Sequence, residues 1–351
     1  TTLYGIEKLE VPSTSSNMTM IYTKVTLTSD IVLNYGLTLS GGSFNLAGNS
    51  LTVKGKMITN ADIDINEGKL IVTGDLDVTG GKVDINKGQL TVNGNIQQSA
   101  GVMDIHIGRL EVAGDYRLRT RNVDELGKIT YSNSSGYIVM TRDSDYVQIG
   151  GNLYIQNSNY SNNLTAGTIE LKGDFTQKKG YDSNFAPSGN HKVIMNGTAK
   201  QTISFESPSS SKFNILDLTG SAGVTVNKPS MSVTTLYGIE KLEVPTAEKT
   251  LTLINTKTSL TSDAAFNFGL VLSGGTLNLS GYSLTVKGDM QTSSTIDFNE
   301  GKIDVASDLF VSGGKIDINK GNLTVGGNVI QSSGVMDIHI GKMEVAGDYR
   351  L

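Results

Sequence analysis

The feature that most constrains this chain is its repetition of itself over a long period. The segment TTLYGIEKLEVP opens the sequence at Thr1 and returns at Thr234. Residues 1–118 align without a gap onto residues 234–351. Because a fixed period outweighs local patterns in deciding a fold, the chain is expected to be a repeat protein. We interpret residues 1–233 as one long unit and residues 234–351 as a partial second copy, continuous with the first.

A shorter period of about twenty residues lies inside the long unit. It is visible when LIVTGDLDVTGGKVDINKGQ is stacked on LTVNGNIQQSAGVMDIHIGR and LEVAGDYRL, which begin at Leu70, Leu90 and Leu110. The second copy keeps this spacing. Repeats of this length are typical of the coils of a solenoid, in which each coil contacts only its neighbours.

Each coil carries three alternating apolar doublets separated by turn residues. In one coil these are Leu70/Val72, Leu76/Val78 and Val83/Ile85. Alternation with a period of two predicts short strands with one buried face, and the Gly and Asn residues between them permit tight corners. No apolar spacing typical of helices is sustained. The sequence therefore predicts an all-β fold, a parallel β-solenoid (β-helix) with three short strands per coil and about 20–24 residues per coil.

The corners are longer between residues 118 and 215. Insertions follow the second doublet at residues 119–128, 156–163, 178–189 and 206–212. Because they fall at the same corner, we expect them to stack into one lateral ridge. The paths of residues 10–30 and 119–146 do not follow from the pattern.

A single coil cannot be stable alone. Its six or so inward side chains gain roughly 1.5–3 kcal/mol each, against about 1–2 kcal/mol of backbone entropy for every residue. Neighbouring coils must supply the difference, and neither terminus shows a polar or helical cap. We therefore expect a stiff rod that continues end to end, through more of the same chain or further copies, with lateral association through the ridge as an added option.

Composition excludes several classes of protein. The formal net charge of −5, with 29 Lys and Arg against 34 Asp and Glu, argues against a nucleic-acid partner. The absence of cysteine excludes disulfides and thiolate metal sites. Neither a signal peptide nor an apolar run long enough to span a bilayer is present, so no membrane insertion is expected.

The runs GGTLNLSGYSLTVKGDM, GGKIDINKGNLTVGGNV and TIELKGDFTQ resemble the β-solenoid repeat regions of long secreted surface proteins of Gram-positive bacteria. The resemblance covers nearly all of the chain. It implies an extracellular or cell-surface protein of fibrous or adhesive function, and it brings no catalytic residues with it.

An acidic column is the most regular polar feature. It comprises Asp64, Asp84 and Asp104, mirrored in the second copy by Asp297, Asp317 and Asp337. Clustered carboxylates suit calcium, so these residues are the candidates for a row of weak calcium sites. The alternative is a solvated face whose charge is offset by Lys82, Lys87 and Asn66 or Asn86.

The three histidines offer no convergent set of metal ligands, because His106 and His339 are the same position in the two copies. His191 lies in an insertion. We interpret all three as corner residues equivalent to Asn66 and Asn86.

The ridge supplies the candidates for binding. Its aromatic residues, with many Asn and Ser, suit a glycan or protein contact, or else cover the underlying strands. They are Tyr154, Tyr160, Tyr181 and Phe185. The charged residues would form the active site of a polysaccharide-cleaving enzyme, which is the less favoured hypothesis. They are Arg119, Arg121, Asp124, Glu125, Lys178, Lys179 and Asp182.

The sequence thus predicts a structural, non-enzymatic segment of an extracellular fibre without a cofactor. The alternatives are an adhesin that binds a glycan or a protein through its ridge, and the enzyme described above.

Overall fold

The chain folds as a parallel β-solenoid. The structure is a computed structural model, and it describes residues 2–3, 16–158, 161–181 and 183–351. Strands account for 57% and helices for 2%, so the protein is nearly all-β, as predicted. The chain divides into two compact units, residues 1–193 and 194–351, and the division falls within β21 (Lys192–Met195).

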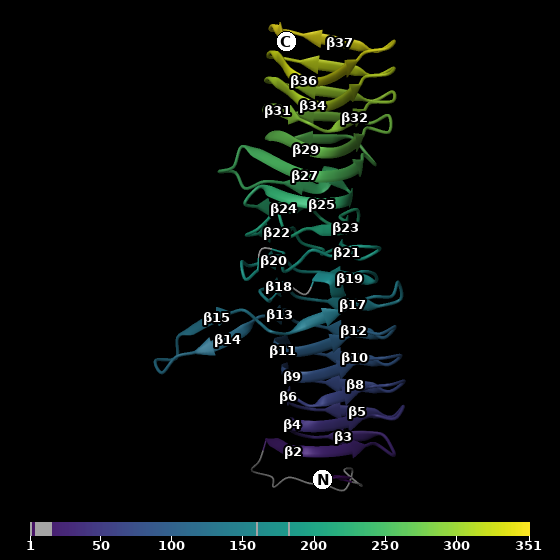
Figure 1. Ribbon diagram of the computed structural model, residues 1–351, viewed down its shortest axis with the longest axis vertical. Helices are drawn as coiled ribbons and strands as arrows, with labels where there is room; N and C mark the ends of the chain where they lie inside the picture. Colours follow the sequence, from purple (N-terminus) through teal and green to yellow (C-terminus); the bar gives the residue numbers. More distant parts are fainter. Residues whose placement is uncertain (1, 4–15, 159–160, 182) are drawn as a thin grey trace. The chain divides into compact units, whose positions relative to one another are not determined.

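In the first unit, the first strand of each coil joins one parallel sheet. Its pairings are in register without gaps, so Leu70, Leu90 and Leu110 are direct neighbours, as the repeat predicted. Figure 1 shows these strands stacked from purple to teal. They are β3 (Ile31–Leu33), β5 (Ser50–Val53), β8 (Lys69–Val72), β10 (Gln89–Val92), β12 (Arg109–Val112), β17 (Tyr146–Ile149) and β19 (Thr168–Leu171).

The second and third strands of each coil form the rest of the stack in the first unit. In several coils they merge into one bent strand. The strands are β1 (Thr2–Leu3), β2 (Asn17–Thr26), β4 (Gly36–Asn45), β6 (Met57–Thr59), β7 (Asp62–Asp64), β9 (Leu76–Asp84), β11 (Ile96–Asp104), β13 (Tyr116–Leu118), β16 (Tyr137–Val139), β18 (Leu153–Ile155) and β20 (Phe175–Gln177). Residues 17–26, whose path the pattern left open, pair with β4 in the same way as any other coil.

Glycine allows the bend between the second and third strands. Gly81 has a φ of 64°, and a Cβ atom there would lie 2.3 Å from the carbonyl oxygen of Ala61 in the preceding coil. Only a residue without a side chain fits so close to its neighbour. The second glycine of the Gly-Gly pair in this corner is therefore required by the stacking of the coils.

The corner between the first and second strands is held by a ladder of side chains. Oδ1 of Asp75 accepts a hydrogen bond from the backbone N–H of Asn95 at 2.7 Å, and Oδ1 of Asn95 accepts one from the N–H of Asp115 at 2.9 Å. Asp115 and Asn152 continue the series, at 2.8 and 2.7 Å. Each coil thus satisfies a backbone donor of the next, which locks the register.

The core is a continuous column of apolar side chains. All six inward residues of the coil that begins at Leu70 are at most 1% exposed. Because strands alternate, every second residue faces this column, and the sequence pattern predicted each of the six correctly.

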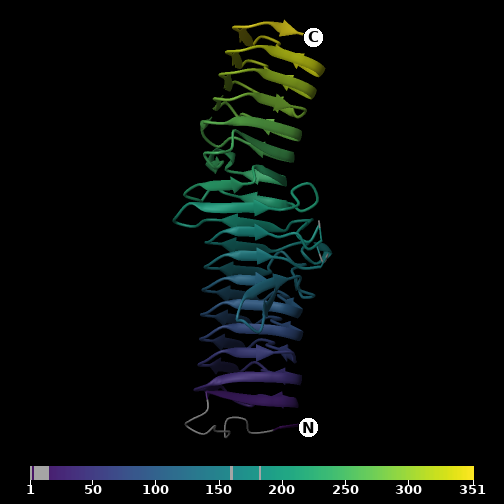
Figure 2. The same ribbon diagram turned by 90° about the vertical axis from the view of Figure 1, so that its left-hand side faces the viewer.

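The second unit repeats this plan. Figure 2 shows its strands stacked from green to yellow. One series comprises β22 (Gln201–Phe205), β24 (Val224–Asn227) and β26 (Leu242–Glu243), and another β28 (Ala264–Phe266), β30 (Ser283–Val286), β33 (Lys302–Val305), β35 (Asn322–Val325) and β37 (Lys342–Val345). The remaining strands are β23 (Phe213–Asp217), β25 (Ser230–Tyr237), β27 (Thr250–Ser259), β29 (Gly269–Asn278), β31 (Met290–Thr292), β32 (Thr295–Asp297), β34 (Leu309–Asp317), β36 (Val329–Asp337) and β38 (Tyr349–Arg350).

Among the residues that the structure describes, helical structure is limited to two short 3₁₀ turns, η2 (Ser161–Asn163) and η3 (Ile239–Lys241). None of the helices in the described part of the chain has the length and hydropathy that a membrane span requires.

Candidate functional site

An antiparallel hairpin interrupts the solenoid after β13. Its strands are β14 (Thr120–Val123) and β15 (Ile129–Ser132), and it projects to the left of the stack in Figure 1. Asp124 forms the turn, since its Oδ1 accepts hydrogen bonds from the backbone N–H groups of Leu126 and Lys128. The chain then returns to the stack at β16, which pairs with β11. This is the path of residues 119–146 that the sequence pattern did not reveal.

The other insertions of the first unit lie beside the base of this hairpin. Ser134 forms a parallel bridge with Asn157, and Nδ2 of Asn184 donates to the carbonyl oxygen of Asn157 at 3.4 Å. Three insertions therefore gather at one corner, as expected for a ridge. The fourth, at residues 206–212, belongs to the second unit.

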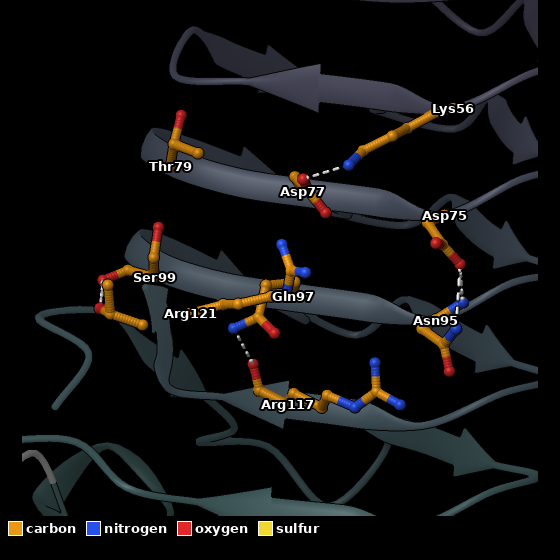
Figure 3. A pocket seen from close by; sticks show the side chains of 10 residues that line it. Lys56, Asp75, Asp77, Thr79, Asn95, Gln97, Ser99, Arg117 and Arg121 are labelled. Carbon is orange, nitrogen blue, oxygen red and sulfur yellow. Dashed lines mark hydrogen bonds and ion pairs between the residues drawn. The ribbon is translucent and has the colours of Figure 1, made fainter. Parts of the chain in front are cut away.

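A polar groove of about 300 Å³ lies between the hairpin and the outward face of the second strands (Figure 3). Its floor consists of side chains that point away from the core, among them Asp77 and Thr79 of β9 and Gln97 and Ser99 of β11. Lys56 and Arg117 line it from the stack, and Arg121 lines it from the hairpin. The groove thus joins residues that are up to 65 positions apart in the sequence.

Two of the three cations of the groove have carboxylate partners. Nζ of Lys56 lies 2.6 Å from Oδ2 of Asp77, and an Nη atom of Arg117 lies 2.6 Å from Oδ2 of Asp115. Arg121 is exposed and forms no ion pair with any described residue. One positive charge on the hairpin side of the groove is therefore not neutralised by any residue in the described part of the chain.

Arg119 fastens the hairpin to the stack. Its guanidinium carbon lies 3.6 Å from the ring centroid of Tyr131 on β15 and 4.4 Å from that of Tyr154 on β18. Burial lowers the pKa of Arg119, and the two rings favour its charged form. The side-chain amide of Gln97 also hydrogen-bonds to the carbonyl oxygen of Arg119. Tyr154, a predicted contact residue, thus holds Arg119 in place.

The remaining predicted contact aromatics differ in their placement. Tyr181 is 57% exposed and remains a candidate for contact. The prediction for Phe185 was wrong, because it is 1% exposed and its ring packs 4.9 Å from that of Phe175 in the core. The insertion folds back far enough to extend the apolar column. Tyr160 lies outside the described residues, as does Asp182.

The acidic column exists as predicted. Asp64 pairs with Asp84 and Asp84 with Asp104 in adjacent strands, and Asp297, Asp317 and Asp337 align in the same way. The carboxylates stabilise the corner between the third strand of one coil and the first strand of the next. Oδ1 of Asp84, for example, accepts a hydrogen bond from the N–H of Asn86, which has a φ of 52°.

A lysine lies between the carboxylates of each column. Nζ of Lys82 is 2.7 Å from Asp84 and 2.8 Å from Asp104, while Lys315 bridges Asp317 and Asp337 at 2.7 and 3.1 Å. Burial opposes the charge of Lys82, but hydrogen bonds with the two carboxylates raise its pKa. Lys82 thus offsets the charge of the column. Lys87 instead approaches Glu67, at 3.5 Å.

Histidine joins each of these clusters, a convergence that the sequence reasoning missed. Nδ1 of His106 lies 3.4 Å from Asp84, and Nε2 of His339 lies 3.1 Å from Asp337. The ligand atoms of Asp84, Asp104 and His106 lie within 4.8 Å of one another, as do those of the equivalent set in the second unit. In-register stacking brings together residues about twenty positions apart, so the short period could have revealed both sets.

His106 and His339 occupy corner positions with φ values of 41° and 48°, as predicted from their alignment with Asn66 and Asn86. The same prediction was wrong for His191. This side chain is fully buried, and its two ring nitrogens have no hydrogen-bond partner among the residues that the structure describes. Burial lowers its pKa to about 4. The long insertion that precedes His191 covers this side chain, whereas the side chain of a corner residue would be exposed to solvent.

The corner ladder is a second feature that the sequence could have shown. It corresponds to a Gly followed by Asp or Asn at Gly74, Gly94, Gly114, Gly151 and Gly173. No comparable sequence pattern marks the groove, because the groove is formed by the hairpin. A comparison of the chain with protein-family models, curated proteins and solved structures gives no match.

Proposed function

We propose that this chain is a structural, non-enzymatic segment of an extracellular fibre, in which coils stack end to end to build a stiff solenoid. The observation that carries the proposal is that successive coils bury each other's apolar residues. Ile105 and Tyr116, for example, are fully buried in the first unit under the coil formed by β16, β17 and β18.

Backbone pairing and the corner ladder pass from one coil to the next without any change in geometry. The partner with the best match is therefore another coil of the same type, in the same chain or in another copy.

The placement of the ridge charges supports a structural role over a catalytic one. Asp124 closes the hairpin turn and Arg119 stacks between two tyrosines, so both have structural tasks. The resemblance of the repeats to bacterial surface proteins supports the extracellular location.

Electron microscopy of the native protein tests this proposal. We expect filaments of constant width with an axial repeat of about 4.8 Å between coils. Isolated particles that do not lengthen with concentration, together with a globular outline, would contradict it.

A further inference from the structure

We propose that the groove beneath the β14–β15 hairpin binds an acidic polysaccharide, with Arg121 pairing with a sugar carboxylate. The first argument is electrostatic. Lys56 and Arg117 have carboxylate partners, whereas Arg121 has none among the described residues. A guanidinium group presents a planar set of donors that matches a carboxylate in two parallel hydrogen bonds. The groove therefore favours a ligand that carries this group.

The second argument is the polar character of the floor, which the solenoid itself does not require. In the second copy, Phe310 stands at the position of Asp77 and Ile330 at that of Gln97. Both copies form the same bent strands with the same register. Asp77 and Gln97 are thus not needed to build a coil. Oδ2 of Asp77 pairs with Lys56, and Nε2 of Gln97 donates to the carbonyl oxygen of Arg119. Oδ1 of Asp77 and Oε1 of Gln97 have no hydrogen-bond partner among the described residues and can accept hydrogen bonds from the hydroxyl groups of a ligand.

The third argument is the shape of the site. The floor residues Asp77, Gln97 and Arg117 occupy the same position in three successive coils. They present polar groups at intervals of about 4.8 Å, which is comparable to the advance of one sugar ring in an extended polysaccharide. A volume of about 300 Å³ lies at the lower end of the range for ligand pockets and suits a short segment of such a chain. The repeated spacing favours a polymer over a single small anion.

Binding is tested by calorimetry at low salt with oligogalacturonate, a neutral oligosaccharide of equal length, and inorganic sulfate as separate probes. We expect oligogalacturonate to bind, and the affinity to fall by about tenfold or more in Arg121→Gln, because a charge-assisted hydrogen bond is lost. The matched control is Arg142→Gln, which removes an exposed arginine of the same unit outside the groove and should leave the affinity unchanged.

A second variant changes the floor of the groove and leaves Arg121 unchanged. Gln97→Ile installs the residue that the second copy carries at this position, so the coil should fold. The floor then loses its amide, together with the hydrogen bond from this amide to the carbonyl oxygen of Arg119. We expect weaker binding of oligogalacturonate in this variant as well. The proposal is overturned if oligogalacturonate fails to bind, if the neutral sugar or sulfate binds as tightly, or if Arg142→Gln weakens binding as much as Arg121→Gln. None of these results depends on filament formation, since binding is measured on the chain in dilute solution.

Discussion

A buried tyrosine–glutamine pair allows a test of how stacking stabilises a coil. The hydroxyl of Tyr116 donates to Oε1 of Gln98 at 2.6 Å, and Nε2 of Gln98 donates to the carbonyl oxygens of Gly101 and Tyr137 at 2.9 and 3.1 Å. Tyr116 is fully buried, and burial raises its pKa.

Replacing Tyr116 with Phe leaves a buried acceptor on Gln98 without a donor, which costs about 1–3 kcal/mol. Amide hydrogen exchange measures the effect coil by coil. Exchange in residues 96–118 should accelerate roughly 5- to 150-fold in Tyr116→Phe, since about 1.4 kcal/mol corresponds to a factor of ten.

The control is exchange in residues 50–64 of the same variant, which we expect to change little, because these residues lie at least two coils away and each coil contacts only its neighbours. Equal acceleration in both segments would refute the reasoning. No change at residues 96–118 would also refute it.

Four further predictions follow from other parts of the stack. His191 is neutral and buried, with a pKa near 4 against an ordinary value of 6.5, so the unfolded state binds a proton first as the pH falls. The free energy of unfolding should therefore fall by up to about 3 kcal/mol from pH 6.5 to pH 4. In urea unfolding, this pH dependence should be lost in His191→Leu, and an unchanged pH profile in that variant would contradict the assignment. Gly81→Ala should lower the melting temperature far more than Gly48→Ala. Both glycines have a positive φ, but only at Gly81 would the added Cβ atom lie 2.3 Å from a backbone oxygen. Equal changes in melting temperature would count against close stacking of the coils. Asp145→Ala should cost about 3 kcal/mol or more in urea unfolding, because the buried carboxylate accepts three backbone N–H groups, and a cost under about 1 kcal/mol would argue against this network. Millimolar calcium should not raise the melting temperature above that in a chelator, because Lys82 already bridges two carboxylates of the column; a rise of several degrees would instead indicate calcium sites.

The repeating part of the fold could be predicted from the sequence because its two signals agree. The alternation that marks Leu70, Val72 and their partners is a direct consequence of strand geometry, and the period near twenty aligns one coil with the next. Once the register is known, contacts such as Lys82 with Asp104 follow from position alone.

The irregular parts could not be predicted in this way. The hairpin strand Thr120–Val123 is polar and lies largely in solvent, so no apolar alternation marks it. His191 and Phe185 are buried by the fold of a long insertion, and neither has an equivalent in another coil. The groove depends on the hairpin, and so its ligand chemistry emerged only from the structure.

Pairwise distances between spin labels test the central claim, that successive coils stack in register along one axis. The chain has no cysteine, so labels can be placed cleanly at Thr52 and at one of Glu111, Gln148 or Glu170. These outward positions are linked by consecutive pairings three, four and five strands apart. At about 4.8 Å per strand, the account predicts separations near 14, 19 and 24 Å that grow linearly. Separations that do not increase in this order would contradict it.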